Sequence, residues 1–167
     1  MIVSNSTPLI YLAKIKRLYL LKELFNEVLI PLEVKSEVVD EGKKRGEVDA
    51  YLIEQGVGAG WLKVEKVSAY LKFDIDIDAG EKAAISLAQE KKQRVVLIDE
   101  IAARTAAKLL KIEPRGTIFV LLLALKQKKI TFDEFLHILA ELAQAGFRLH
   151  EEIYTAAIEE AQRISKR

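Results

Sequence analysis

The stretch Ile2-Val3-Ser4-Asn5-Ser6-Thr7-Pro8-Leu9-Ile10 predicts a short buried strand, a polar turn and the start of a helix. Pro8 suits the first position of that helix, and Thr7 suits its N-cap. A side chain in the turn stands at the carboxyl end of a strand, where open α/β sheets bind their ligands. We therefore expect Asn5 to lie at the edge of a ligand site.

Short apolar strands alternate with helical segments along the rest of the chain. After the first strand, the pattern predicts strands or short extended segments at 28–30, 61–67, 95–98 and 112–115. Helical periodicity covers 9–25 with a break near 15–16, then 32–44, 47–55, 78–92, 100–110, a segment from 116, 132–145 and 150–165. This alternation favours an α/β fold with a parallel sheet of four to five short strands between helical layers.

Two strands and one helix carry more specific signals. The run 95–98 is continuously apolar, as expected for a strand buried on both faces. The run 61–67 alternates apolar and charged residues, which is typical of a strand at or near a sheet edge. Thr131 and Glu134 form a capping box for the helix at 132–145.

Length and composition describe a globular protein. With 167 residues the chain is most simply one domain, 1–167, on which we expect the C-terminal helices from about residue 131 to pack. Half of the residues are apolar and 31% are charged. Cysteine is absent, which excludes disulfides, thiolate zinc sites and cysteine nucleophiles and favours a reducing compartment.

Charge and hydropathy bear on location and partners. The longest apolar run, 118–125, is too short to cross a bilayer, and no secretory signal precedes the fold, so we expect a cytoplasmic protein without a membrane partner. The net charge of +1 argues against an extended basic surface, and the clusters 43–45 and 126–129 are typical of solvated helix faces. Asparagine occurs only at positions 5 and 26 amid abundant Lys and Glu, which favours a heat-adapted source.

Asp99 and Glu81 are candidates for an acidic site, and each has a purely structural alternative. Asp99 directly follows the apolar strand, where a catalytic acid would be displayed, but it also suits the N-cap of the helix that begins near Glu100. Glu81 and Asp78 form an acidic version of a capping box, and the same helix start would present Glu81 to a cation.

Glu37 is the third candidate. It belongs to an i, i+4 stripe of glutamates, which is typical of a solvated face, yet it lies at the boundary of a buried face. Carboxylates that converge from different elements suit Mg²⁺ or Mn²⁺, which polarise a phosphoryl group and lower the pKa of an attacking water. Phosphodiester hydrolysis is the chemistry that needs them together. Arg104, one turn beyond Glu100, would then contact phosphate or form an ordinary surface ion pair.

These residues resemble the PIN-domain family, and more narrowly a PIN-like subfamily related to VapC-type toxins. The resemblance covers almost the whole chain in the expected order: 2–10, 30–38, 78–81, 97–104, 116–117 and 145–149. It implies a three-layer α/β/α fold with a parallel central sheet. It also implies an Mg²⁺- or Mn²⁺-dependent endoribonuclease, since many PIN domains have that activity.

The resemblance also assigns residues. It implies that Glu37, Glu81 and Asp99 are catalytic and that they bind metal together with position 5. Supporting roles fall on Thr7, Glu100 and Arg104. The family's leading aspartate falls on position 5, where this chain has Asn5. An amide oxygen ligates a hard cation without negative charge, so we expect one weakly held ion rather than a tightly held pair.

Two functions stay open at this point. The first is a metal-dependent endoribonuclease weakened by Asn5, acting on RNA as the toxin of a toxin–antitoxin pair with a small antitoxin protein as partner. The second is a catalytically inactive PIN-like scaffold that binds RNA or a protein partner, and the apolar C-terminal helices leave room for a homodimer. An aspartyl-phosphate phosphotransferase is disfavoured, because an amide at position 5 cannot replace its nucleophile.

Overall fold

Five short parallel strands form one sheet in the computed structural model, which describes residues 1–167. The strands are β1 (Ile2–Ser4), β2 (Val28–Pro31), β3 (Leu62–Glu65), β4 (Val95–Leu97) and β5 (Glu113–Arg115). Their order is β3-β2-β1-β4-β5, and every neighbouring pair runs parallel. The predicted parallel sheet is confirmed, with the strand from 61–67 at one edge.

Helices connect the strands in the predicted order. Between β1 and β2 lie α1 (Ser6–Lys14) and α2 (Tyr19–Phe25). Between β2 and β3 lie α3 (Leu32–Lys35), the π-helical segment η1 (Ser36–Glu41), α4 (Gly42–Lys44) and α5 (Val48–Gly58). One helix follows each of the next two strands: α6 (Ala79–Glu90) and α7 (Ile101–Leu109).

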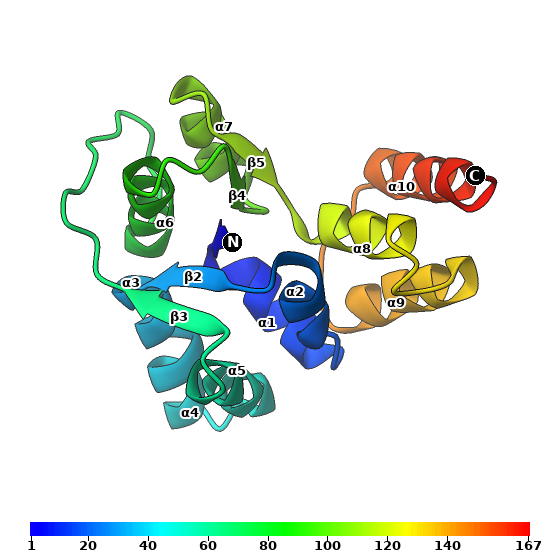
Figure 1. Cartoon of the computed structure of the whole chain (residues 1–167), viewed down its shortest axis with the longest axis horizontal. Helices are drawn as coiled ribbons and strands as arrows, with labels where there is room; N and C mark the ends of the chain where they lie inside the picture. Colours follow the sequence, from blue (N-terminus) through cyan, green and yellow to red (C-terminus); the bar gives the residue numbers. More distant parts are fainter. The chain divides into compact units, whose positions relative to one another are not determined.

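The sheet separates two helical layers. Val3, Leu29 and Val96 alternate along their strands with residues that face the other way, and they share one buried cluster with side chains of α6 and α7. Figure 1 shows α6 and α7 on one side of the sheet and α1 and α5 on the other. The three-layer α/β/α architecture predicted from the sequence is confirmed.

The chain changes direction across the sheet at β1 and β4. From β1 it builds outward through β2 and β3, and it then returns to the other side of β1 as β4. Ser4 pairs with Leu97, and the backbone N–H of Asn5 donates to the carbonyl of Leu97 at 2.9 Å. The residues that follow β1 and β4 therefore meet at a topological switch point, where such sheets bind ligands.

The start of α1 differs from the prediction. The helix begins at Ser6 with Asn5 as N-cap, so the predicted N-cap at Thr7 and first position at Pro8 were wrong by two residues. Proline fits the third position as well, because the first four N–H groups of a helix have no partner within the helix. The turn between strand and helix is consequently reduced to Asn5 alone.

Residues 118–167 form a second compact unit, and residues 1–117 form the first. The second unit contains α8 (Thr117–Lys126) beyond its first residue, α9 (Phe132–Gln144) and α10 (Glu151–Ser165). The capping box at Thr131 and Glu134 is confirmed. The prediction that the helices from about 131 pack on a single domain stays a prediction. No helix is both long and apolar enough to cross a membrane.

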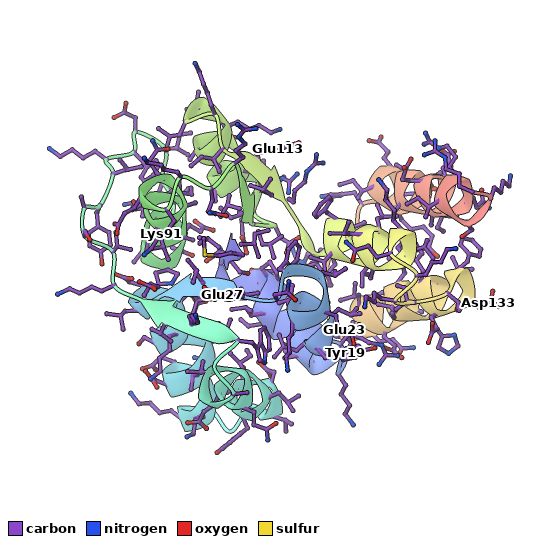
Figure 2. The ribbon with its side chains drawn as sticks, in the orientation of Figure 1. Tyr19, Glu23, Glu27, Lys91, Glu113 and Asp133 are labelled. Carbon is purple, nitrogen blue, oxygen red and sulfur yellow. The ribbon has the colours of Figure 1, made fainter.

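Surface charges are paired locally. Each residue of the basic cluster 43–45 has an acidic partner, namely Glu54, Glu41 and Glu47 in turn. Glu27, Lys91 and Glu113, labelled in Figure 2, pair with Lys63, Glu65 and Arg115. The cluster 43–45 is therefore a neutralised helix face, as its sequence indicated.

Candidate functional site

Asn5, the N-cap residue of α1, is the centre of the site. It is 3% exposed, and its side-chain oxygen Oδ1 is buried without a hydrogen-bond partner. Its amide nitrogen Nδ2 donates to Oε2 of Glu100 at 3.3 Å. Because buried polar atoms are nearly always paired, this orphaned oxygen is available to a ligand.

Ser6 connects the turn to Glu37. Its buried hydroxyl Oγ donates to Oε2 of Glu37 at 2.6 Å, a bond between residues 31 positions apart. Glu37 lies in η1 and is exposed overall, as the glutamate stripe predicted. The hydroxyl nevertheless holds one carboxylate oxygen of Glu37 against the carboxyl end of β1.

Asp78 and Glu81 open α6 beside the same turn. Asp78 accepts from the N–H of Glu81 at 2.7 Å, and Glu81 accepts from the N–H of Asp78 at 2.8 Å, which confirms the predicted capping box. Glu81 is 6% exposed. Burial raises the pKa of Glu81, and the negative charges of Asp78, Glu100 and Glu37 act in the same direction.

Gly80 leaves space between these oxygens. A Cβ atom at Gly80 would lie 3.4 Å from Oδ1 of Asp78, 3.4 Å from Oε2 of Glu37 and 3.5 Å from Oδ1 of Asn5. Three oxygen atoms from three different elements therefore surround a space that any side chain at position 80 would fill. Two carboxylates, those of Asp78 and Glu37, and the amide oxygen of Asn5 thus approach one another at this point.

Glu100 is the N-cap residue of α7, and its carboxylate turns toward β1. Oε2 accepts from Nδ2 of Asn5, and Oε1 accepts a hydrogen bond from the hydroxyl of Thr7. Both carboxylate oxygens of Glu100 are thus held by the turn that follows β1. The resemblance gives Thr7 a supporting role, and in the structure its hydroxyl donates to the carboxylate of Glu100.

Asp99 has different partners. Its Oδ1 accepts from the N–H of Thr117 at 2.8 Å, and its Oδ2 accepts from the Thr117 hydroxyl at 2.7 Å. Burial raises the pKa of Asp99 to about 6, against the lowering effect of both bonds from Thr117. The predicted structural alternative, an N-cap for the helix near Glu100, was wrong, because Asp99 binds the first residue of α8 instead.

Gly116 and Arg104 enclose Asp99. A Cβ atom at Gly116 would lie only 2.4 Å from Oδ1 of Asp99, so the close approach requires glycine. Nη1 of Arg104 donates to the carbonyl of Ile98 at 2.9 Å, and the Arg104 charge acts to lower the pKa of Asp99. The structure therefore gives Arg104 a place beside Asp99, and a phosphate contact stays a prediction.

The donors fit a hard divalent cation in type. They are carboxylate and amide oxygens, which Mg²⁺ and Mn²⁺ prefer, and the unpartnered Oδ1 of Asn5 faces the space beside Gly80. No group of three or more acidic or histidine side chains already stands in an arrangement that could hold one ion. Binding would therefore require the side chains around Gly80 to close on the ion.

Three residues of this arrangement were not among the predicted site residues: Ser6, Asp78 and Gly80. A glycine at the second position of a helix is a poor helix former, so Gly80 carried a signal of close approach in the sequence. Asp78 was explained by its capping role alone. Ser6 carried no signal, because only the folded chain brings it to Glu37.

Comparison with known proteins agrees with this architecture. A family model described as a PIN domain matches residues 1–163. No curated protein and no solved structure matches the chain significantly. PIN domains are generally nucleases that use divalent metals. Since the match covers nearly the whole sequence, the chain belongs to the PIN-domain family.

Proposed function

We propose that this protein is a metal-dependent endoribonuclease whose site is weakened by Asn5. The observation that carries the proposal is the unpartnered, buried Oδ1 of Asn5, which shares the space beside Gly80 with Oε2 of Glu37. Glu81 and one of the two acids that follow β4, Asp99 or Glu100, are the further carboxylates of the proposed site.

Asn5, Glu37, Glu81 and one of the two acids after β4 would hold Mg²⁺ or Mn²⁺. The bound ion would polarise a phosphoryl oxygen and lower the pKa of an attacking water. Glu81 is one candidate to exchange a proton, because burial raises its pKa above the ordinary value of a glutamate. Ser6 and Thr7 orient Glu37 and Glu100 from the turn, and Asn5 contributes an oxygen without a negative charge.

RNA as substrate, a small antitoxin protein as partner and a homodimer belong to the same proposal. Support for RNA and an antitoxin comes from the resemblance to VapC-type toxins, and the apolar C-terminal helices leave room for a homodimer. A toxin role predicts that induced expression arrests growth of a bacterial host and that Glu37→Gln relieves the arrest. Light scattering tests the homodimer, and growth after induced expression tests the toxin role. Unimpaired growth at matched expression would contradict the toxin role.

Cleavage of a structured RNA tests the nuclease proposal. We expect cleavage with Mn²⁺ or Mg²⁺ and none with EDTA. Gly80→Ala is the sharpest variant, because its methyl group fills the space between the oxygens at ordinary contact distances and leaves the capping box intact. Gly58→Ala is the matched control, since a Cβ atom there meets nothing within 4 Å.

The expected results separate the two functions. We expect Gly80→Ala, Glu37→Gln and Glu81→Gln to reduce cleavage at least tenfold and Gly58→Ala to retain it. Binding of RNA without cleavage in any metal would identify an inactive scaffold instead. Equal cleavage by the wild type and Gly80→Ala would exclude this location for the site.

A further inference from the structure

We propose that Glu100, and not Asp99, is the carboxylate that the end of β4 contributes to the cation site, and that Asn5 positions it. This inference rests on the proposed function, because it assigns a ligand within the same site. Asp99 and Glu100 are consecutive, so the assignment decides which of two neighbouring acids faces β1. It also gives the amide at position 5 a role of its own.

The first observation is that two side chains of the turn after β1 hold the carboxylate of Glu100. Nδ2 of Asn5 and the hydroxyl of Thr7 donate to different oxygens of its carboxylate. The donors come from the N-cap and the second residue of α1, which are fixed by β1 and by the buried start of the helix. Glu100 is therefore held against the turn although it lies 95 positions from Asn5 in the sequence.

The second step is the orphaned oxygen. With Nδ2 of Asn5 directed to Glu100, Oδ1 points to the space beside Gly80, where Oε2 of Glu37 also lies. An amide has one donor group, so it can satisfy only one of these two carboxylates. Its oxygen then faces the other carboxylate and has no hydrogen-bond donor. A buried oxygen without a partner costs free energy. A cation beside Gly80 removes that conflict.

The third step is the position of Asp99. Both of its oxygens accept hydrogen bonds from Thr117, and Oδ1 lies tight against Gly116. Moving the Asp99 carboxylate toward Asn5 would break both bonds to Thr117. Glu100, in contrast, is already bonded to Nδ2 of Asn5, whose Oδ1 borders the space beside Gly80.

The assignment also explains how the site tolerates an amide. An aspartate at position 5 would set a carboxylate at hydrogen-bonding distance from that of Glu100, and like charges so close oppose each other without a cation. The amide replaces this repulsion with a hydrogen bond. Glu100 thus supplies the negative charge that position 5 lacks.

Isothermal titration of the full chain with Mn²⁺ alone tests the assignment. Glu100→Gln decides it, because the glutamine keeps the size of the side chain and can still accept from Thr7. Asp99→Asn is the matched control, because its amide oxygen still accepts from the Thr117 N–H. Thermal unfolding with and without Mn²⁺ gives a second readout that does not depend on activity.

We expect Glu100→Gln to weaken Mn²⁺ binding at least tenfold and to abolish the thermal shift caused by Mn²⁺. We expect Asp99→Asn to bind within about threefold of the wild type. Wild-type affinity in Glu100→Gln overturns the assignment, whether or not Asp99→Asn folds. Loss of binding in a folded Asp99→Asn overturns it as well.

Failure of this inference differs from failure of the proposed function. If the wild type binds Mn²⁺ and cleaves RNA while Glu100→Gln does so equally well, only the assignment of Glu100 is wrong. If the wild type neither binds Mn²⁺ nor cleaves RNA, the proposed function and the assignment fail together.

Discussion

Asp99 and Glu100 are neighbours in sequence with opposite surroundings. Asp99 is enclosed by Thr117 and Gly116, and burial raises its pKa to about 6. Glu100 faces the turn after β1 and is held by Asn5 and Thr7. Asp99 thus binds the start of α8, whereas Glu100 faces the carboxyl ends of the central strands, where the ligand site is expected.

The difference follows from where strand β4 ends. Ile98 still bonds to the backbone of Arg115, so Asp99 emerges beside β5 and the residues that follow it. Glu100 comes one residue later, at the N-cap of α7, and its longer side chain returns toward β1. The two carboxylates therefore bind different elements, with Asp99 bonded to the start of α8 and Glu100 to the start of α1.

The largest expected effect concerns the pH dependence of stability through Asp99. Its pKa is about 6 in the folded chain against an ordinary value of 3.8, so the folded state binds the proton more tightly than the unfolded state does. Stability from this group is complete below pH 3.8 and is lost as the pH rises to about 6. A shift of about two pKa units corresponds to up to about 3 kcal/mol.

Asp99→Asn removes this dependence. Urea unfolding of both proteins in EDTA at several pH values from 4 to 7 should show the wild type losing stability relative to the variant as the pH rises. Parallel profiles would mean that Asp99 is not buried as described, and the contrast with Glu100 would then disappear.

Gly116→Ala should lower stability by about 2 kcal/mol, because its Cβ atom would lie 2.4 Å from Oδ1 of Asp99 and would force the carboxylate away from Thr117. Chemical denaturation measures the loss. Gly58→Ala, whose Cβ atom meets nothing within 4 Å, should show none. Equal stability of Gly116→Ala and the wild type would contradict the enclosed position of Asp99.

Asn5→Asp changes the side chain that holds Glu100. Without metal, the new carboxylate faces Glu100 and should lower the free energy of unfolding by about 1 kcal/mol. With Mn²⁺ the added charge should raise affinity about tenfold, or about 1.4 kcal/mol. Titration with Mn²⁺ and thermal unfolding in EDTA measure the two effects. An unchanged affinity would place position 5 outside the cation site.

Ser6→Ala should have the smallest effect. It removes the hydroxyl that bonds Oε2 of Glu37 at 2.6 Å, so Mn²⁺ affinity should fall about threefold and stability by about 1 kcal/mol. Ser36→Ala, at an exposed position of η1, is the matched control for titration and unfolding. If both variants behave alike, Ser6 does not orient Glu37.

Most of the fold could be predicted from local patterns. The continuously apolar run at 95–98 and the alternating run at 61–67 gave a buried and an edge strand, because burial on one or two faces dictates the pattern. Both capping boxes formed as expected, since they need only residues three apart. The start of α1 was misplaced because Ser, Thr and Asn all suit an N-cap.

The site was predicted only in part, because its contacts are long-range. Glu37, Glu81 and the pair after β4 were named from position and resemblance, but Ser6 was not. No local pattern shows that the hydroxyl of Ser6 meets an acid 31 positions away. The ligand roles of Asn5, Glu37, Glu81 and Asp99 stay predictions.

Three properties follow from the sequence alone: the alternation of strands and helices, the membership in the PIN-domain family and the amide at position 5. These depend on hydrophobic period and residue identity, which are local properties. The hydrogen bonds from Asn5 to Glu100 and from Thr117 to Asp99 follow only from the folded chain. Because the two acids are adjacent along the chain, only the order of the strands and the path of the chain after β4 select their hydrogen-bond partners.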